Sequence, residues 1–182
     1  MIGLIILLIL ISAFYVGGRR GTPLQIVSTI GFGFSLFVAE VLYEDLAKKL
    51  ELYIPYPSVT EDSKMVFFDL TTALDLDKAY YAAISFLLVL FGGWLVTKLV
   101  LIFFNNLRFK RLLKNYDWLL GGLLNVVIAY TVIFLLLYVL SMVPLAIIQN
   151  VFRDSSIARM VVEDTPILSE LFHKLWVTNI LA

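Results

Sequence analysis

The sequence predicts an all-α integral membrane protein: a bundle of four transmembrane helices with additional extracytoplasmic amphipathic helices. Three observations lead to this prediction. The 182 residues are 61% apolar, with a mean hydropathy of +0.95, whereas soluble domains are about 45–50% apolar. Several apolar runs approach or exceed the roughly 20 residues that cross a bilayer. The segments between them are charged or rich in Gly and Pro, and such segments do not lie exposed to hydrocarbon.

The composition also excludes several classes of function. Basic and acidic residues number 14 each, so the net charge is zero and nothing indicates a nucleic-acid partner. Cysteine is absent, which excludes disulfides and thiolate metal sites. The N-terminal residues carry no basic region of the kind that precedes a cleaved signal peptide, so we expect the first apolar run to remain in the membrane.

Residues 2–16 form the first predicted span, and the turn that follows determines the topology. We interpret Gly17, Gly18, Arg19, Arg20 and Gly21 as a turn at a membrane surface, and the two arginines predict that this surface is cytoplasmic. A helix over 2–16 rises only about 22 Å, less than a hydrocarbon core of roughly 30 Å. The first two apolar runs are therefore either spans in a thinned bilayer or a re-entrant hairpin.

The second predicted span covers residues 24–43. Its small residues at four-residue spacing share one helix face, which we interpret as a packing face against the first span or a second copy: Gly31, Ser35 and Ala39. Beyond the membrane, Glu44–Lys48 and Asp45–Lys49 are spaced as ion pairs. The connection from Glu44 to Lys78 holds eight acidic and four basic residues, which favours the outside. In it we expect a capping box of Ser58 with Glu61 and an amphipathic helix over residues 63–76. This helix lies either at the membrane interface or against the ends of the bundle.

The third and fourth predicted spans cover residues 79–104 and 118–142. We expect a close crossing at Gly92 and Gly93, and a second packing face at Gly121, Asn125 and Ala129. Between these spans lies a basic stretch that we place on the cytoplasmic side: Arg108, Lys110, Arg111 and Lys114.

Residues 153–182 are predicted to form an amphipathic helical tail at the membrane surface. Asp154 or Ser155 starts one helix, and Thr165-Pro166 starts a second. The second helix has one apolar face, formed by Leu168, Leu171, Phe172, Leu175 and Trp176. With four spans, both termini are predicted to lie outside.

We find no catalytic, cofactor-binding or metal-binding constellation in the sequence. His173 stands alone on a polar helix face, where we interpret it as solvated. Four polar residues are predicted to lie at similar depth in the inner leaflet: Ser12, Tyr15, Lys98 and Asn125. They form either a functional polar layer, or a site at which Lys98 extends to the headgroups while Asn125 bonds a neighbouring group.

Two segments carry a resemblance to a known family. Gly17-Gly18-Arg19-Arg20-Gly21 resembles the Gly-x-Arg-Arg-Gly turn of the bacterial colicin V production protein (CvpA) family. Asp117-Trp118-Leu119-Leu120-Gly121 is similar to that family's Asp-x-Leu-Leu-Gly segment, and Asn125 replaces a glycine frequent in relatives. The resemblance covers most of the chain, and the outer connection is least alike. It implies a four-span inner-membrane protein, linked to colicin V production or export and to envelope homeostasis, with no established catalytic residues.

These observations favour a non-enzymatic accessory protein of the bacterial plasma membrane that acts through helix–helix assembly. Its expected partners are the lipid bilayer and either further copies of itself or other envelope proteins, and no cofactor is expected. The alternative is a small oligomeric channel or transporter that uses the polar layer around Lys98 and Asn125. An intramembrane enzyme is the third hypothesis, and no sequence motif supports it.

Overall fold

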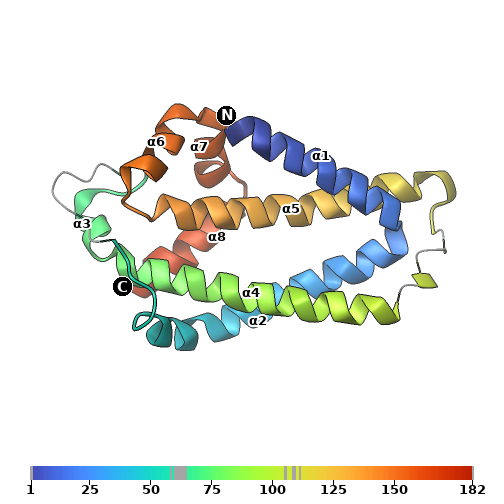
Figure 1. Ribbon diagram of the computed structural model, residues 1–182, viewed down its shortest axis with the longest axis horizontal. Helices are drawn as coiled ribbons and strands as arrows, with labels where there is room; N and C mark the ends of the chain where they lie inside the picture. The colour runs from blue at the N-terminus through green and yellow to red at the C-terminus, as the bar shows by residue number, and fades with distance from the viewer. Residues whose placement is uncertain are drawn as a thin grey trace. The chain divides into compact units, whose positions relative to one another are not determined.

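The structure is a computed structural model that describes residues 2–57, 59, 65–104, 106–107, 110 and 112–181. It is 83% helical, and no strand occurs in those ranges. Four helices are long and apolar enough to cross a membrane: α1 (Ile2–Arg20), α2 (Thr22–Leu50), α4 (Leu76–Phe103) and α5 (Asp117–Ser141) (Figure 1). These helices confirm the predicted fold class.

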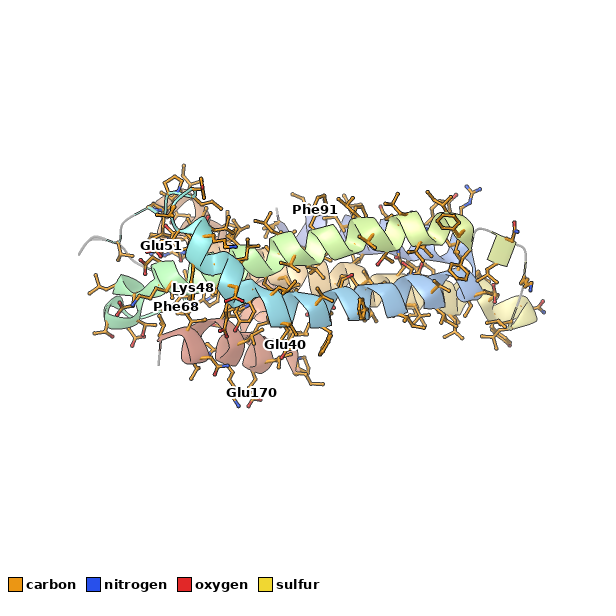
Figure 2. The ribbon with its side chains drawn as sticks, turned by 90° about the horizontal axis from the view of Figure 1, so that it is seen from below. Glu40, Lys48, Glu51, Phe68, Phe91 and Glu170 are labelled. Carbon is orange, nitrogen blue, oxygen red and sulfur yellow. The ribbon has the colours of Figure 1, made fainter. Side chains whose placement is uncertain are left out.

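The long helices leave most of their apolar side chains exposed. Only 11% of the apolar window of α1 and 17% of that of α4 are buried within the chain, against 39% for α5. Phe91 is 57% exposed and lies on the side of α4 turned away from α2 (Figure 2). Such apolar surface needs lipid or other helices around it.

By its internal contacts the chain divides into two compact units. The glycine-crossing unit, named for a contact between Gly17 and Gly121, comprises Leu4–Val41 and Leu88–Val132. The tail unit comprises Met1–Gly3, Leu42–Leu87 and Ile133–Ala182. Helices α1, α2, α4 and α5 contribute residues to both units. The candidate functional site lies in the glycine-crossing unit.

Helix α1 extends through most of the predicted turn. Gly17, Gly18, Arg19 and Arg20 form its last helical turn, and the chain reverses at Gly21, which has a φ of +81°. The predicted turn was therefore too long, because Gly17 and Gly18 serve a close helix contact rather than a change of direction. The 19 residues of α1 rise about 28 Å, which nearly matches a core of roughly 30 Å. This length removes the geometric reason for a re-entrant hairpin.

The connection after α2 folds differently from its prediction. Helix α3 covers only Leu70–Leu74, and residues 65–69 are not helical. The backbone N–H of Val66 donates to the Gln149 side chain at 2.9 Å, and Phe67 contacts Phe152 edge to face at 5.0 Å. The predicted 63–76 helix is wrong over this stretch, because its backbone and apolar side chains bind α6 instead. The expected capping box and the beginning of that helix lie outside the described residues, as do Arg108 and Arg111.

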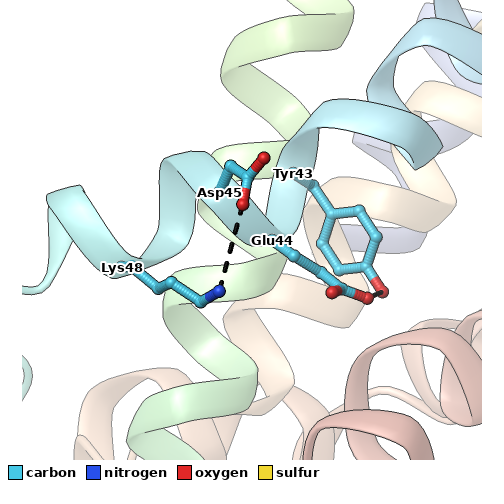
Figure 3. Close-up of polar contacts among 4 residues, drawn as sticks. All are labelled: Tyr43, Glu44, Asp45 and Lys48. Carbon is cyan, nitrogen blue, oxygen red and sulfur yellow. Dashed lines mark hydrogen bonds and ion pairs between the residues drawn. The ribbon is translucent and has the colours of Figure 1, made fainter.

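The acidic end of α2 also pairs differently from the expected pattern. Lys48 forms an ion pair with Asp45 at 3.9 Å, whereas Glu44 accepts a hydrogen bond from the Tyr43 hydroxyl at 3.1 Å (Figure 3). The expected Glu44–Lys48 pair is therefore absent from this described segment. Both members of the observed ion pair are largely exposed, so it contributes little to stability.

Several short helices form the C-terminal part of the tail unit: α6 (Ala146–Asp154), α7 (Ser156–Glu163), α8 (Leu168–Phe172), a π-helical turn (His173–Thr178) and α9 (Asn179–Leu181). Ser155 caps α7 as predicted, since its hydroxyl accepts from the Ala158 N–H at 3.3 Å. Helix α6 was not predicted. Thr165 does not cap α8, because its hydroxyl donates to the Val161 carbonyl at 2.6 Å instead.

The apolar face of the last helices packs inward within the tail unit. Trp176 and Phe172 are buried and contact the ring of Phe86 on α4 at 5.4 Å each. Trp176 also meets Tyr138 on α5 at 5.6 Å. The interpretation of this face as a membrane-surface face was therefore wrong for Phe172 and Trp176. Amphipathic spacing shows only that a face needs an apolar partner, and here α4 and α5 provide it.

Candidate functional site

Helices α1 and α5 cross at Gly17 and Gly121. A Cβ atom on Gly121 would lie 2.7 Å from the Gly17 carbonyl oxygen, and one on Gly17 would meet the Gly121 carbonyl oxygen. Gly18 packs on the backbone of Trp118 in the same way, where a Cβ would lie 3.0 Å from the carbonyl oxygen. Because the obstacles are backbone atoms, no rotamer change could make room. Small residues at such a crossing allow close helix approach in lipid.

Asp117 ties the beginning of α5 to the turn between α1 and α2. Its carboxylate accepts from the backbone N–H of Thr22 at 3.1 Å and from that of Leu112 at 3.1 Å. The Thr22 hydroxyl donates to the Asp117 carbonyl at 2.7 Å. A Cβ on Gly21 would lie 2.9 Å from this carboxylate. Asp117 is 7% exposed and stands in the first turn of α5, so these bonds are made in a buried position.

A polar network within the apolar part of the unit links three helices. Gln25 on α2 donates from Nε2 to the side-chain amide oxygen Oδ1 of Asn125 on α5 at 3.1 Å. Asn125 donates from Nδ2 to the Ala13 carbonyl on α1 at 2.7 Å. Gln25 is fully buried, and its Oε1 has no hydrogen-bond partner among the described residues. Asn125 therefore fills the place of the expected glycine and joins α1 to α2.

The structure does not join the predicted polar layer into one site. Ser12 and Tyr15 are exposed, and the Tyr15 hydroxyl accepts from Arg19 at 3.3 Å. The Lys98 ammonium lies 5.0 Å from the centre of the Trp94 ring. Asn125 bonds Gln25 and Ala13 rather than Lys98. The prediction used only the depth of these residues along their spans, and their side chains point in different directions around the helix axes.

The predicted packing face of α2 meets α4, not α1. A Cβ on Gly31 would lie 2.7 Å from the Thr97 hydroxyl oxygen, and a Cβ on Gly93 would lie 2.7 Å from Ser35 Cβ. Gly92 has open space where a Cβ would point. Of the remaining residues of the two predicted faces, Ala39 is fully buried and Ala129 is half-buried.

His173 lies in the tail unit, far along the sequence from these groups. It lines a cavity of about 350 Å³ together with Glu163, Glu170 and Tyr138. No group of three or more His, Asp or Glu side chains that could hold a metal ion is found in the described parts of the chain. Also in the tail unit, the Tyr56 hydroxyl donates to the Met142 carbonyl at 2.8 Å. Burial, and then the Asp77 carboxylate, raise the pKa of Tyr56.

The sequence reasoning missed Thr22 and Gln25 as site residues and noted Asp117 only within a motif. Gln25 gave a usable signal, because an amide two residues after Pro23 at the beginning of an apolar span needs a buried partner. Chemically, the arrangement holds three helices in register and presents no nucleophile with an adjacent base among the residues described. It is a structural centre of the unit.

Comparisons with known proteins match nearly the whole chain. Residues 2–166 match the model of the family described as Colicin V production protein. An uncharacterized transmembrane protein of Bacillus subtilis (strain 168), YshB, is 29% identical over 176 residues, which cover 97% of each chain. No solved structure matches. The family match includes the glycine crossing, Asp117 and the Gln25–Asn125 network.

Proposed function

The chain belongs to the Colicin V production protein family, and from this premise we propose that it is a non-enzymatic accessory protein of the bacterial inner membrane. It acts by helix–helix assembly with further copies of itself or with other envelope proteins, with both termini outside. The family description supports a role in the production of colicin V. The transmembrane relative supports the membrane location.

One observation carries the assembly proposal: adjacent glycines of α4 have different surroundings. Gly93 packs against Ser35 of α2, whereas no atom lies within 4 Å of a Cβ built on Gly92. Successive residues of a helix point about 100° apart, so Gly92 faces outward when Gly93 faces α2. A glycine on an outward apolar face allows the backbone of another helix to approach closely.

The absence of cysteine from the sequence gives a direct test. Gly92→Cys and, as a matched control, Phe91→Cys are introduced one at a time and oxidised in native membranes. Phe91 is an exposed neighbour at nearly the same depth but on another side of α4. A disulfide needs Cα atoms within about 7 Å, so we expect a cross-linked product at position 92 and little at position 91. Equal or absent cross-linking at both positions, with a monomer after purification, would refute the proposal.

A small oligomeric channel or transporter is the second candidate. The observation that favours it is the buried Gln25 Oε1, an unsatisfied acceptor that water in a path could bond. In this case Asn125→Cys should react with a small water-soluble thiol reagent in permeabilised cells, as should Lys110→Cys at an exposed position. A silent Asn125→Cys beside a labelled Lys110→Cys would rule out water at this network.

A further inference from the structure

Two cavities of the tail unit share three of the residues that line them. They measure about 350 Å³ and about 560 Å³, and Phe67, Phe68 and His173 line both. All of their lining residues belong to the tail unit. Sites for small molecules in proteins have volumes of roughly 300–1,000 Å³, so each cavity is large enough for a small organic ligand.

Aromatic rings form the apolar wall of these cavities, and other rings hold them in place. Phe67 packs edge to face on Phe152 at 5.0 Å. Tyr138 is 3% exposed and contacts Trp176 at 5.6 Å. Phe68 follows Phe67 in the non-helical stretch before α3, and both rings are half-buried. Because this wall is packed before any ligand binds, little side-chain freedom is lost on binding.

The charged residues around the cavities are acidic. Glu163 and Glu170 line the smaller cavity, and Asp69 and Asp75 line the larger one. No lysine or arginine is among the described residues that line them. Asp75 pairs with Lys78 at 3.8 Å, whereas the other three carboxylates form no ion pair within the described ranges. A cleft lined by one sign of charge attracts ions of the opposite sign, so these cavities favour a cationic ligand.

Rings beside carboxylates suit an organic ammonium ion better than other cations. An aromatic face attracts a cation within about 6 Å of its centre, and the carbon groups of an alkylated ammonium can be covered by apolar walls. A metal ion instead needs several ligands at one point. No group of three or more His, Asp or Glu side chains in the described part of the chain could provide them.

The smaller cavity lies beside the end of a membrane-length helix. Tyr138 precedes Ser141, the last residue of α5, by three positions, which is about 4.5 Å along the axis. Glu163, Glu170 and His173 are exposed. If α5 spans the bilayer, this end lies near the headgroups. An ammonium ion can therefore reach the cavity from water or as the headgroup of a phospholipid.

We propose that the two cavities of the tail unit bind a small organic ammonium ion. The smaller cavity holds the ammonium group between the Tyr138 ring and the carboxylates of Glu163 and Glu170. The larger cavity, which shares Phe67 with the smaller one, has room for the rest of the molecule. The site is independent of the proposed assembly through Gly92, because Gly92 belongs to the glycine-crossing unit.

Isothermal titration calorimetry of the purified full chain in a neutral detergent tests this site, with protein-free micelles as the blank. The probes are phenyltrimethylammonium and tert-butylbenzene, which have the same shape and differ in charge. Glu163→Gln and Glu170→Gln each remove one charge from the smaller cavity. Glu51→Gln, the matched control, removes a charge just after α2 at a residue that lines neither cavity (Figure 2). All three side chains are exposed, and a thermal melt confirms that each variant is folded.

We expect the wild type to bind phenyltrimethylammonium more tightly than tert-butylbenzene. Glu163→Gln and Glu170→Gln should each bind the cation about fivefold more weakly, as for the loss of one charge about 4 Å away in water. Glu51→Gln should bind it as the wild type does, and tert-butylbenzene should bind equally to all four proteins. Equal affinity of the wild type for the two probes would overturn the proposal, as would an unchanged affinity of both cavity variants for the cation.

Competition distinguishes the two sources of the ammonium group. Choline and dihexanoylphosphatidylcholine are each titrated against bound phenyltrimethylammonium. Displacement at a lower concentration of choline assigns the site to a soluble cation, and displacement at a lower concentration of the phospholipid assigns it to a lipid headgroup. Displacement by neither compound would overturn the assignment of an ammonium ligand.

Discussion

Substitution of Gly93 or Gly92 by alanine separates a used helix contact from an unused one. The two residues are adjacent in α4 and lie at nearly the same depth, and the sequence makes them equivalent. A Cβ on Gly93 would lie 2.7 Å from Ser35 Cβ and 3.2 Å from Ser35 Cα, whereas a Cβ on Gly92 would meet nothing within 4 Å. Because Cα and Cβ are fixed by the backbone, Ser35 cannot rotate away from the new methyl group.

The geometry sets the size of the effect. To restore an ordinary contact of 3.4 Å, α2 must move by about 0.7 Å, and overpacking of this kind costs about 1–3 kcal/mol. Both alanines gain about the same helix propensity, roughly 1 kcal/mol relative to glycine, so this term cancels between the variants. We therefore expect Gly93→Ala to be less stable to unfolding than Gly92→Ala by about 1–3 kcal/mol.

Titration of the monomeric protein from mild detergent into sodium dodecyl sulfate measures this difference, with tryptophan fluorescence as the signal. Use of the monomer removes any contribution from contacts between copies at Gly92. The reasoning fails if Gly93→Ala is as stable as Gly92→Ala or more stable, because the contact with Ser35 would then have no steric consequence.

The same assay tests three further residues. Asp117→Ala leaves two backbone N–H groups without their acceptor and should lower the free energy of unfolding by about 1–3 kcal/mol. Asp117→Asn should have a stability between those of the wild type and Asp117→Ala. An Asp117→Ala variant as stable as the wild type would show that water replaces the carboxylate. Asn125→Ala should be destabilising because it leaves the buried Gln25 amide without its acceptor, and adding Gln25→Leu should restore part of the lost stability. If the destabilisations of the two single variants simply add in the double variant, the two side chains do not form a network. Burial and then Asp77 raise the pKa of Tyr56 in the folded state, so its contribution is complete below the ordinary value of about 10 and is lost as the pH rises above it. Tyr56→Phe should reduce this alkaline loss of stability, and a loss of unchanged size would assign it to other groups.

The tail shows the limit of pattern reasoning. The spacing of Phe172 and Trp176 correctly indicated an apolar face that must be covered. It did not indicate what covers that face, since a membrane surface and the rings of α4 and α5 satisfy the same spacing. In the same way, residues 63–76 have a helical pattern, yet Val66 and Phe67 bind α6 outside any helix. Gln149 accepts from the Val66 backbone, and Phe152 packs against the Phe67 ring.

The sequence by itself determined the fold class, the four apolar runs and the family, because length, hydropathy and local motifs act along the chain. Only the tertiary structure decided which small residues are used: Gly17, Gly31, Gly93 and Gly121 in helix contacts, but not Gly92. It also decided that Asn125 meets Gln25 across 100 positions of sequence. The physical reason is that helical periodicity gives the direction of a side chain around its own axis, whereas contacts depend on how far each neighbouring helix is rotated and shifted.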